Sequence, residues 1–152
     1  MTPRLPHADE LGSLPLTDEA AVLERVAALV RCATRRQLWF LPLDAGRRQL
    51  PLVVPVEVPR RPDDDAGRVL AGLVAALGTV AKVAEVVVVI ERPGPEVTTI
   101  DDLAWLAALG EARELVDVPI VGPMLAHDAG VRWAPGSHRD AGDDPASPRG
   151  ES

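Results

Sequence analysis

Acidic side chains stand next to the strongest apolar segment of this chain of 152 residues. Glu91 directly follows the apolar run at 86–90, Asp101 and Asp102 come shortly after it, and Glu57 lies near the end of an earlier apolar segment. Carboxylates that gather in one place bind divalent cations through their oxygens or exchange protons as an acid–base pair. These residues are therefore candidates for a hydrolytic site that uses carboxylates or a divalent metal ion.

The same residues also have structural interpretations. Thr99 and Asp102 have the spacing of a capping box, in which a hydroxyl and an acid satisfy the first amide groups of a helix. We favour this role for Asp102, and in it the change Asp102→Asn should cost only a helix-dipole contribution of about 0.3–1 kcal/mol. At their strand end, Glu91 and Arg92 are expected to pair with each other or with neighbours in solvent, and an exposed pair of this kind contributes about 0–1 kcal/mol.

The remaining residues with reactive side chains give weaker signals. His127 stands beside Asp128 and is expected in a loop that faces water. The single cysteine, Cys32, excludes an internal disulfide and a thiolate zinc cluster, and it is expected to pack on a helix as a small apolar residue. Cys32 and His127 are of residue types that can form a catalytic pair, and nothing else in the sequence supports such a pair. The chain has no glycine-rich phosphate loop, GxSxG elbow or HExxH helix.

Composition limits the partners of the protein. Apolar residues make up 47% of the chain and aromatic residues only 3%, so the core must consist of Val, Leu and Ala. The net charge of −7 argues against nucleic acid, which needs a basic surface. The three arginine pairs, at 35–36, 47–48 and 60–61, are interpreted as solvated ends of elements. No signal peptide or apolar run long enough to span a membrane stands out, so we expect a cytoplasmic protein.

The elements that must position these residues follow from apolar periodicity and from the placement of proline and glycine. Residues 1–16 are proline-rich and predict a flexible arm, residues 17–135 predict one domain, and residues 136–152 predict a disordered acidic tail. Apolar residues recur at helical spacing in three segments of the domain. Helices are expected at about 18–33, 69–80 and 99–115.

Strands are expected at 37–43, 50–58, 83–90, 116–125 and 131–133. Prolines in the first two cannot donate to a ladder, so this hairpin should be irregular or lie near a sheet edge. The apolar run at 83–90 does not alternate with polar residues, which predicts a central strand buried on both faces. The helical crossover from the hairpin favours a parallel neighbour for this strand. The chain is thus expected to form an α/β domain of three layers, with a mixed sheet between helices.

Several short sequences stand in the order of a known architecture. They are Trp39-Phe40-Leu41-Pro42-Leu43-Asp44, the strand at 86–90 with Pro93-Gly94, Thr99-Ile100-Asp101-Asp102, Leu115-Val116-Asp117-Val118-Pro119-Ile120-Val121-Gly122 and Gly130-Val131-Arg132-Trp133. This order resembles the JAB/MPN (JAMM) superfamily of metallohydrolases, most closely its RadC-like branch, over about residues 36–134. The resemblance implies a JAB/MPN-like fold with cytidine-deaminase-like architecture.

The chain departs from the superfamily at the metal-binding positions. Family members hold zinc with two histidines and an aspartate, and an upstream glutamate is the general base. Asp102 stands at the aspartate position, and Glu57 is a loose candidate for the glutamate. The histidine positions fall on Val89 and Glu91 or, with one gap, on Ile90 and Arg92.

The resemblance therefore implies a fold without the family's zinc site. We expect no metal, no cofactor and no catalytic residue, with Glu57, Glu91 and Asp102 as the weak metal candidates if a site exists. The leading hypothesis is a non-catalytic interaction or scaffold module that binds a protein partner or itself. The alternatives are a hydrolase with a carboxylate or divalent-metal site and a small-ligand module at the carboxyl end of the central strand. A cleft lined by acids would favour the enzyme, and an apolar patch with Trp39, Phe40 or Trp105 would favour the scaffold.

Overall fold

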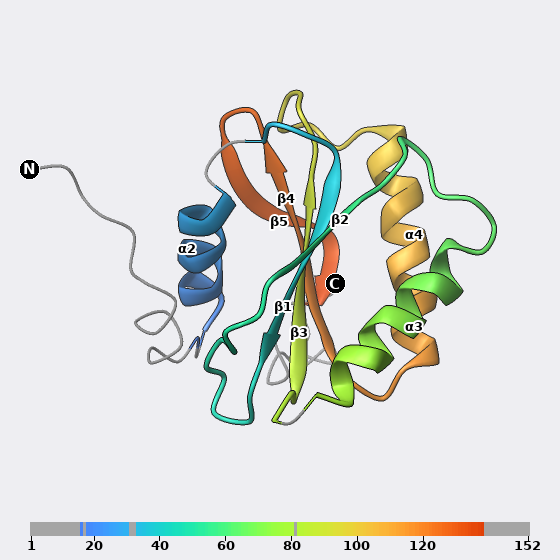
Figure 1. Ribbon diagram of the computed structural model, residues 1–152. Coiled ribbons are helices and arrows are strands. Elements are labelled where there is room, and N and C mark those ends of the chain that lie inside the picture. The colour runs from blue at the N-terminus through green and yellow to red at the C-terminus, as the bar shows by residue number, and fades with distance from the viewer. Residues whose placement is uncertain (1–15, 17, 31–32, 81, 139–152) are drawn as a thin grey trace, which may run out of the picture.

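The computed structural model describes residues 16, 18–30, 33–80 and 82–138, and in 136–138 it describes the backbone alone. The helices are α2 (Glu19–Val30), α3 (Ala66–Gly78) and α4 (Ile100–Leu115). The strands are β1 (Gln37–Leu43), β2 (Val54–Glu57), β3 (Glu85–Glu91), β4 (Ile120–His127) and β5 (Gly130–His138). They form one mixed sheet in the order β2-β1-β3-β4-β5. Helix α2 covers one face of the sheet, and α3 and α4 cover the other, which confirms the α/β class (Figure 1).

Strand β3 is the centre of the sheet, as its apolar run predicts. Every residue of this strand is buried. Val86, Val88 and Ile90 pack into the core under α3 and α4, whereas Val87 and Val89 pack into the core under α2. Successive side chains of a strand point to opposite faces, so an unbroken apolar run supplies both cores at once.

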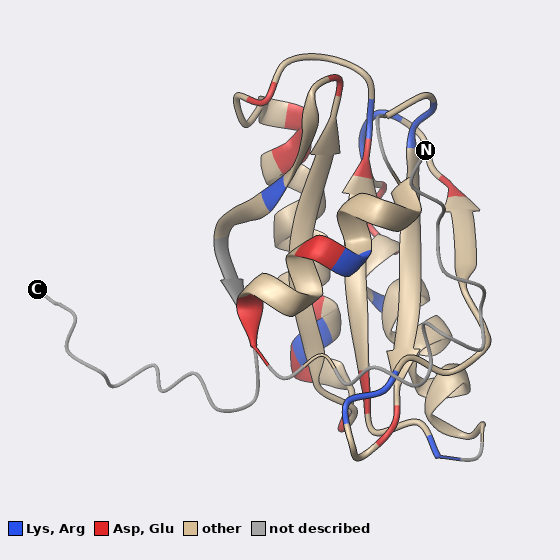
Figure 2. Ribbon diagram, turned by 90° about the vertical axis from the view of Figure 1, so that its left-hand side faces the viewer, with Lys and Arg blue, Asp and Glu red and all other residues tan. Residues whose placement is uncertain are grey.

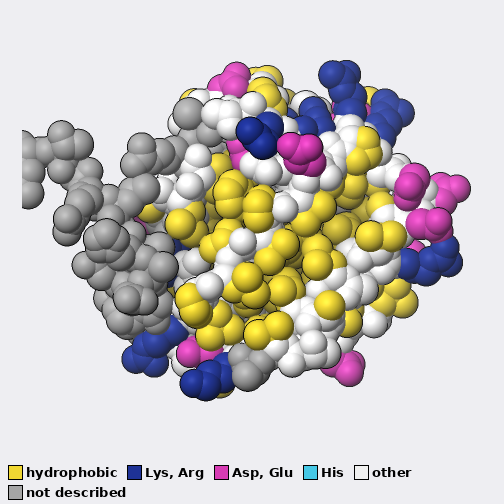
Figure 3. All heavy atoms as spheres, in the orientation of Figure 1, with side chains coloured by type: hydrophobic (Ala, Val, Ile, Leu, Met, Phe, Trp, Pro, Cys, Tyr) yellow, Lys and Arg dark blue, Asp and Glu magenta, His cyan; other side chains and the backbone are white. Residues whose placement is uncertain are grey.

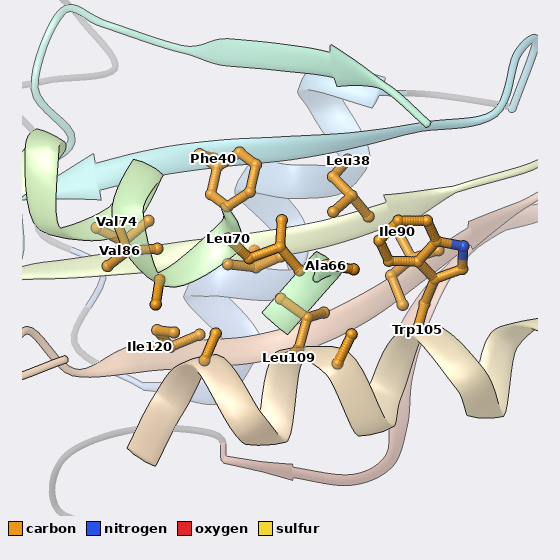
Figure 4. Close-up of a cluster of buried hydrophobic side chains, with 14 of the residues drawn as sticks. Leu38, Phe40, Ala66, Leu70, Val74, Val86, Ile90, Trp105, Leu109 and Ile120 are labelled. Atoms are coloured by element: carbon orange, nitrogen blue, oxygen red, sulfur yellow. The ribbon is translucent and has the colours of Figure 1, made fainter. Parts of the chain in front are cut away.

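The larger core lies between the sheet and the two helices α3 and α4. Figure 4 shows Phe40 and Leu70 approaching one another from strand and helix, with Leu109 and Trp105 along α4. Aliphatic residues fill most of the remaining volume, in keeping with the low aromatic content of the chain. Charged residues keep mainly to helices, loops and the ends of strands, and the middle of the sheet is uncharged (Figure 2).

The expectation that the crossover from the hairpin gives the central strand a parallel neighbour is wrong, because the hairpin strand beside β3 is antiparallel to it. β1 is antiparallel to both β2 and β3, so it lies between the hairpin's return strand and the central strand. The helical crossover through α3 therefore skips one position in the sheet. The parallel neighbour of β3 is β4, which the second crossover, through α4, brings beside it.

Element boundaries differ from the expected ones at both sides of the sheet. β2 is shorter than the segment 50–58 and forms the edge of the sheet, as its prolines predict. β5 is longer than 131–133 and continues to His138, three residues beyond the expected boundary at 135, because its backbone pairs with β4 at Gly122. Of the arm expected at 1–16, the structure describes Leu16 alone, and this residue is buried in the core under α2. Residues 1–15, Cys32 and the tail from 139 lie outside the described residues.

Two glycines should respond oppositely to the same substitution. Gly122 has φ of +106°, and a Cβ there would lie 2.8 Å from the carbonyl oxygen of Val88. Gly110 lies inside α4, and a Cβ there would meet nothing within 4 Å. Gly110→Ala should therefore stabilise the fold by roughly 0.5–1 kcal/mol, whereas Gly122→Ala should destabilise it by more than that. Urea unfolding of both variants checks the pair, and equal effects would contradict the described backbone at Gly122.

Candidate functional site

A buried ion pair joins the end of β3 to the start of α4. The guanidinium of Arg92 approaches the carboxylate of Asp102, with Nη2 to Oδ2 at 2.8 Å and Nε to Oδ1 at 3.1 Å. Both residues are only 2% exposed. The contact is a planar, two-pronged arrangement that suits arginine and carboxylate. Arg92 was expected to pair with Glu91 or with another neighbour in solvent; its partner is a neighbour, Asp102, and the expected solvent exposure is wrong.

Asp102 is also part of the helix cap that its spacing with Thr99 predicts. The Thr99 hydroxyl accepts a hydrogen bond from the Asp102 amide at 3.1 Å, and Asp102 Oδ2 accepts one from the Thr99 amide at 2.9 Å. The capping box is therefore confirmed. Its acid has a second role as the partner of Arg92, and the sequence gives no signal for that role.

The loop between β3 and α4 is held from two sides by arginines. Arg92 donates to the carbonyl oxygens of Pro95 and Val97. Arg132, from β5, donates to the carbonyl oxygen of Glu96 at 2.6 Å and to the Thr98 hydroxyl at 2.7 Å. Side chains thus satisfy the carbonyl groups of a loop that has no regular structure of its own, which gives it a defined conformation.

The environment of Asp102 favours its charged form. Burial by itself would raise the pKa of this carboxyl group, but the hydrogen bonds and positive charge of Arg92 and the amide of Thr99 outweigh that effect. The pKa of Asp102 is therefore lowered from its ordinary value. Near neutral pH the carboxyl group is therefore ionised and paired with Arg92, and it carries no proton that it could transfer.

Glu91 lies on the other face of the sheet, in its own cage of donors. Its Oε1 accepts from Gln37 Nε2 and Trp39 Nε1, each at 2.7 Å, and its Oε2 accepts from the amides of Thr34 at 2.7 Å and Arg35 at 3.3 Å. Burial would raise the pKa of Glu91, and these hydrogen bonds lower it further than burial raises it. The solvent-exposed position expected for Glu91 is therefore wrong.

The structure does not bring the candidate acids together. Because β3 alternates, Glu91 continues the face of Val87 and Val89, toward α2, whereas Arg92 and Asp102 meet on the side of α4. Glu57 is exposed at the edge and pairs with Arg35 at 3.3 Å. Asp101 pairs with Arg60 and Arg61. Within the described part of the chain, no group of three or more His, Cys, Asp or Glu side chains is placed to hold a metal ion.

His127 differs from the expected loop histidine that faces water. It is the last residue of β4, is 5% exposed, and its Nδ1 accepts a hydrogen bond from the Ala129 amide at 3.2 Å. The side chain closes the turn between β4 and β5. Sequence reasoning placed the end of β4 two residues too early, so it left this histidine outside the sheet.

An apolar groove, which the sequence analysis did not identify, lies along the outer edge of the sheet. It encloses about 200 Å³ between β2, the loop that follows β2, and α3. Its apolar walls come from three elements and include Val56, Val58, Val69, Leu70 and Trp105. On this face of the molecule, hydrophobic side chains gather between charged ones at the rim (Figure 3). The signal in the sequence was an edge strand with apolar residues on the side that faces a helix.

The wall formed by residues 59–62 is held in place by α4. The indole Nε1 of Trp105 donates to the carbonyl oxygens of Pro59 at 3.2 Å and Arg60 at 3.1 Å. Arg61 Nε donates to Asp101 Oδ1 at 2.8 Å. The groove is thus preformed by side-chain contacts to the loop, and a ligand would not need to order it.

The residues that align with the metal-binding positions of the resembled superfamily do not suit zinc. Asp102 already has a cationic partner, Glu91 points to the opposite face, and Val89 and Ile90 offer only hydrocarbon. A zinc ion beside Asp102 would meet the positive charge of Arg92 and would lack imidazole ligands.

No protein-family model matches the chain, and no significant match is found among curated proteins. None of the described helices has the length and hydropathy needed to cross a membrane.

The Arg92–Asp102 pair should dominate the stability of this region. Asp102→Asn leaves the guanidinium buried without a counter-charge, so it should destabilise the fold by about 3–5 kcal/mol. This value replaces the small cost expected for a cap alone. Asp101→Asn is the matched control, because its arginine partners are largely exposed and its loss should cost about 0–1 kcal/mol. Chemical unfolding of the two variants checks the difference, and equal midpoints would contradict a dominant buried pair.

The same carboxyl groups should make the fold sensitive to acid. Asp102 and Glu91 both have lower pKa values in the folded chain than in the unfolded chain. Their stabilising effect is complete above the unfolded values of about 4 and is lost as pH falls through the lower folded values, since the unfolded state then binds more protons. Unfolding midpoints should therefore drop below about pH 4. Glu91→Gln should show a smaller drop than wild type, and identical pH profiles would count against the lowered pKa of Glu91.

Proposed function

We propose that this protein is a non-catalytic interaction module with a JAB/MPN-like fold, and that the groove beside β2 is its docking surface. The order of elements supports the family assignment, because a hairpin, a helix, a central strand, a capped helix and two closing strands follow one another as in the resembled family. On this proposal the protein acts in the cytoplasm by holding a protein partner.

The observation that carries the proposal is the preformed apolar groove that contains Trp105. Exposed apolar surface costs free energy in water, and contiguous apolar patches on soluble proteins commonly mark interaction sites. Val69 is 65% exposed on α3 and is nevertheless apolar. The volume of about 200 Å³ is below the range of roughly 300–1,000 Å³ typical of small-molecule sites, so the groove suits side chains of a partner better than a cofactor.

The contacts of the acids argue against the alternative hydrolase. Each of the four candidate carboxylates is engaged by its own cation or hydrogen-bond donors. The guanidinium of Arg92 occupies the side of Asp102 that a metal ion would need, and it also blocks the junction as a small-ligand crevice. A hydrolytic reaction at this junction would have neither a free carboxylate nor a cationic centre for water.

Selection from a library of random short peptides displayed on phage tests the docking role. Wild-type protein should enrich peptides whose binding falls at least about tenfold in Val69→Asp, since the new charge would be buried against their apolar side chains. Val97→Asp is the matched control, because Val97 is 67% exposed and lies away from the groove. Failure to enrich peptides that depend on Val69 would overturn the docking surface.

The same preparations test the hydrolase alternative. Protein purified without chelator should contain no stoichiometric zinc, and EDTA should leave its melting midpoint unchanged. Stoichiometric zinc that is lost in Asp102→Asn would restore the metal site and refute the non-catalytic assignment.

A further inference from the structure

Helix α4 is apolar on the side that faces solvent as well as on the side that faces the core. With α3 it forms the outer layer on one face of the sheet (Figure 1). Its buried residues are Asp102, Trp105, Ala108, Leu109 and Ala112. The segment 103–110 includes no charged side chain, although the exposed side of a surface helix normally carries charged and polar residues. The solvent-facing side lies outside the groove, so the docking role proposed above does not account for it.

Four residues at the centre of this exposed side form what we call the α4 stripe: Ile100, Leu103, Ala107 and Gly110. Ile100 is 72% exposed and Leu103 is 53% exposed. Ala107 is also exposed, and a Cβ at Gly110 would meet nothing within 4 Å. Spacings of three, four and three residues place the four on one side of the helix. The bulky pair stands in the first half of the helix and the small pair in the second half.

The α4 stripe is complementary to itself in the antiparallel direction. Its spacings are the same from either end, so a two-fold axis through the middle of the stripe brings Leu103 of one copy beside Ala107 of the other. The same axis brings Ile100 of one copy beside Gly110 of the other. Each bulky side chain then meets a small residue. In a parallel pair the bulky residues would meet one another, and the small residues would leave a gap.

Charged residues at the end of α4 are mainly acidic. Glu111 and Glu114 are exposed there. The guanidinium of Arg113 turns away from them and donates to the carbonyl oxygens of Ile120 and Gly122. This end of the helix therefore presents negative charge to solvent.

The beginning of α4 has an excess of arginine. Arg60 and Arg61 lie beside it, with side chains that are 76% and 68% exposed, and they share the single carboxylate of Asp101. Glu96 and Arg132 also lie at this end, where the guanidinium of Arg132 donates to the carbonyl oxygen of Glu96, and their charges offset one another. In an antiparallel pair of helices, the acidic end of one copy is next to the arginines of the other, so the charges are complementary.

We propose that α4 is a self-association surface, on which a second copy of this chain packs its own α4 in the antiparallel direction. Leu103 of each copy lies over Ala107 of the other, and Ile100 lies over Gly110. The carboxylate of Glu111 pairs with the exposed arginines beside the start of the other helix. The chain thus forms a two-fold dimer whose grooves remain available to other partners.

Sedimentation equilibrium of the full chain tests the dimer. The overlapping segments, 100–110, are about 15 Å long at 1.5 Å per residue, so the contact is small and the dimer should dissociate on dilution between about 1 mM and 1 μM. Leu103→Asp should abolish the dimer, because its carboxylate would be buried against an apolar surface. Leu115→Asp is the matched control, since Leu115 is 56% exposed on the same helix but lies beyond the overlap. A wild-type chain that stays monomeric throughout would overturn the proposal.

Exchanging the bulky and small residues tests the antiparallel arrangement. Leu103→Ala leaves a gap, and Ala107→Leu sets two leucines against one another. Each variant alters both symmetric contacts of the dimer, so each should weaken it by about tenfold or more. The chain that carries both changes has the two residue sizes exchanged and should recover most of the wild-type affinity. A double variant that is as weak as the single ones would refute this packing.

Reversing one charge tests the contact at the helix ends. Glu111→Lys should weaken the dimer several-fold, because lysine would meet the arginines of the other copy. Glu24→Lys, at an exposed position on α2, changes the net charge by the same amount and should leave the dimer unchanged or tighter. Equal effects of the two changes would count against the proposed pairing.

The groove variant separates this dimer from the docking role. Val69→Asp should leave the dimer unchanged, and Leu103→Asp should leave the groove-dependent peptides bound, because the two positions lie on different helices. A dimer that is lost in Val69→Asp and kept in Leu103→Asp would place the second copy in the groove and overturn the pairing of α4. If no peptide binds but the dimer depends on Leu103, the docking role fails and the α4 dimer stands.

Discussion

The arrangement at the end of the central strand depends on the buried pair of Arg92 and Asp102. Removing both charges from water carries a large desolvation cost, and their attraction offsets it only when the remaining hydrogen-bonding groups are also satisfied. Here the Thr99 amide donates a further hydrogen bond to the Asp102 carboxylate, and the loop carbonyl oxygens accept hydrogen bonds from the Arg92 guanidinium. Breaking either partner would leave a buried charge, so the start of α4 cannot move away from the end of β3.

Strand alternation explains why the neighbouring acid belongs to a different environment. Glu91 and Arg92 are adjacent in sequence, yet one lies among donors on the face of α2 and the other on the face of α4. A metal site at this junction would require ligands that converge from one side. The chain uses the two positions to anchor two separate segments instead, the residues before β1 and the loop before α4.

Local signals in the sequence were sufficient for much of the fold. The apolar run of β3, the capping box of Thr99 and Asp102, and the prolines of β2 each act within a few residues, and each prediction from them is confirmed. The burial of Glu91 and Arg92 could not be read in this way, because their partners at 34–39 and 102 are brought near only by the folded sheet. The groove was missed for the same reason, since Val56, Val69 and Trp105 belong to three separate elements.

The free edge of the sheet shows how one residue can limit self-association without closing a binding surface. An unpaired strand edge can pair with strands of other chains, and the risk of aggregation grows with the number of consecutive backbone donors that the edge presents. Pro55 removes one donor in the middle of β2, whereas Glu57 keeps its own. Backbone pairing at this edge is therefore too short to provide affinity by itself. A ligand must gain most of its binding free energy from a side chain in the groove, so selectivity follows from the shape and the apolar walls of that groove.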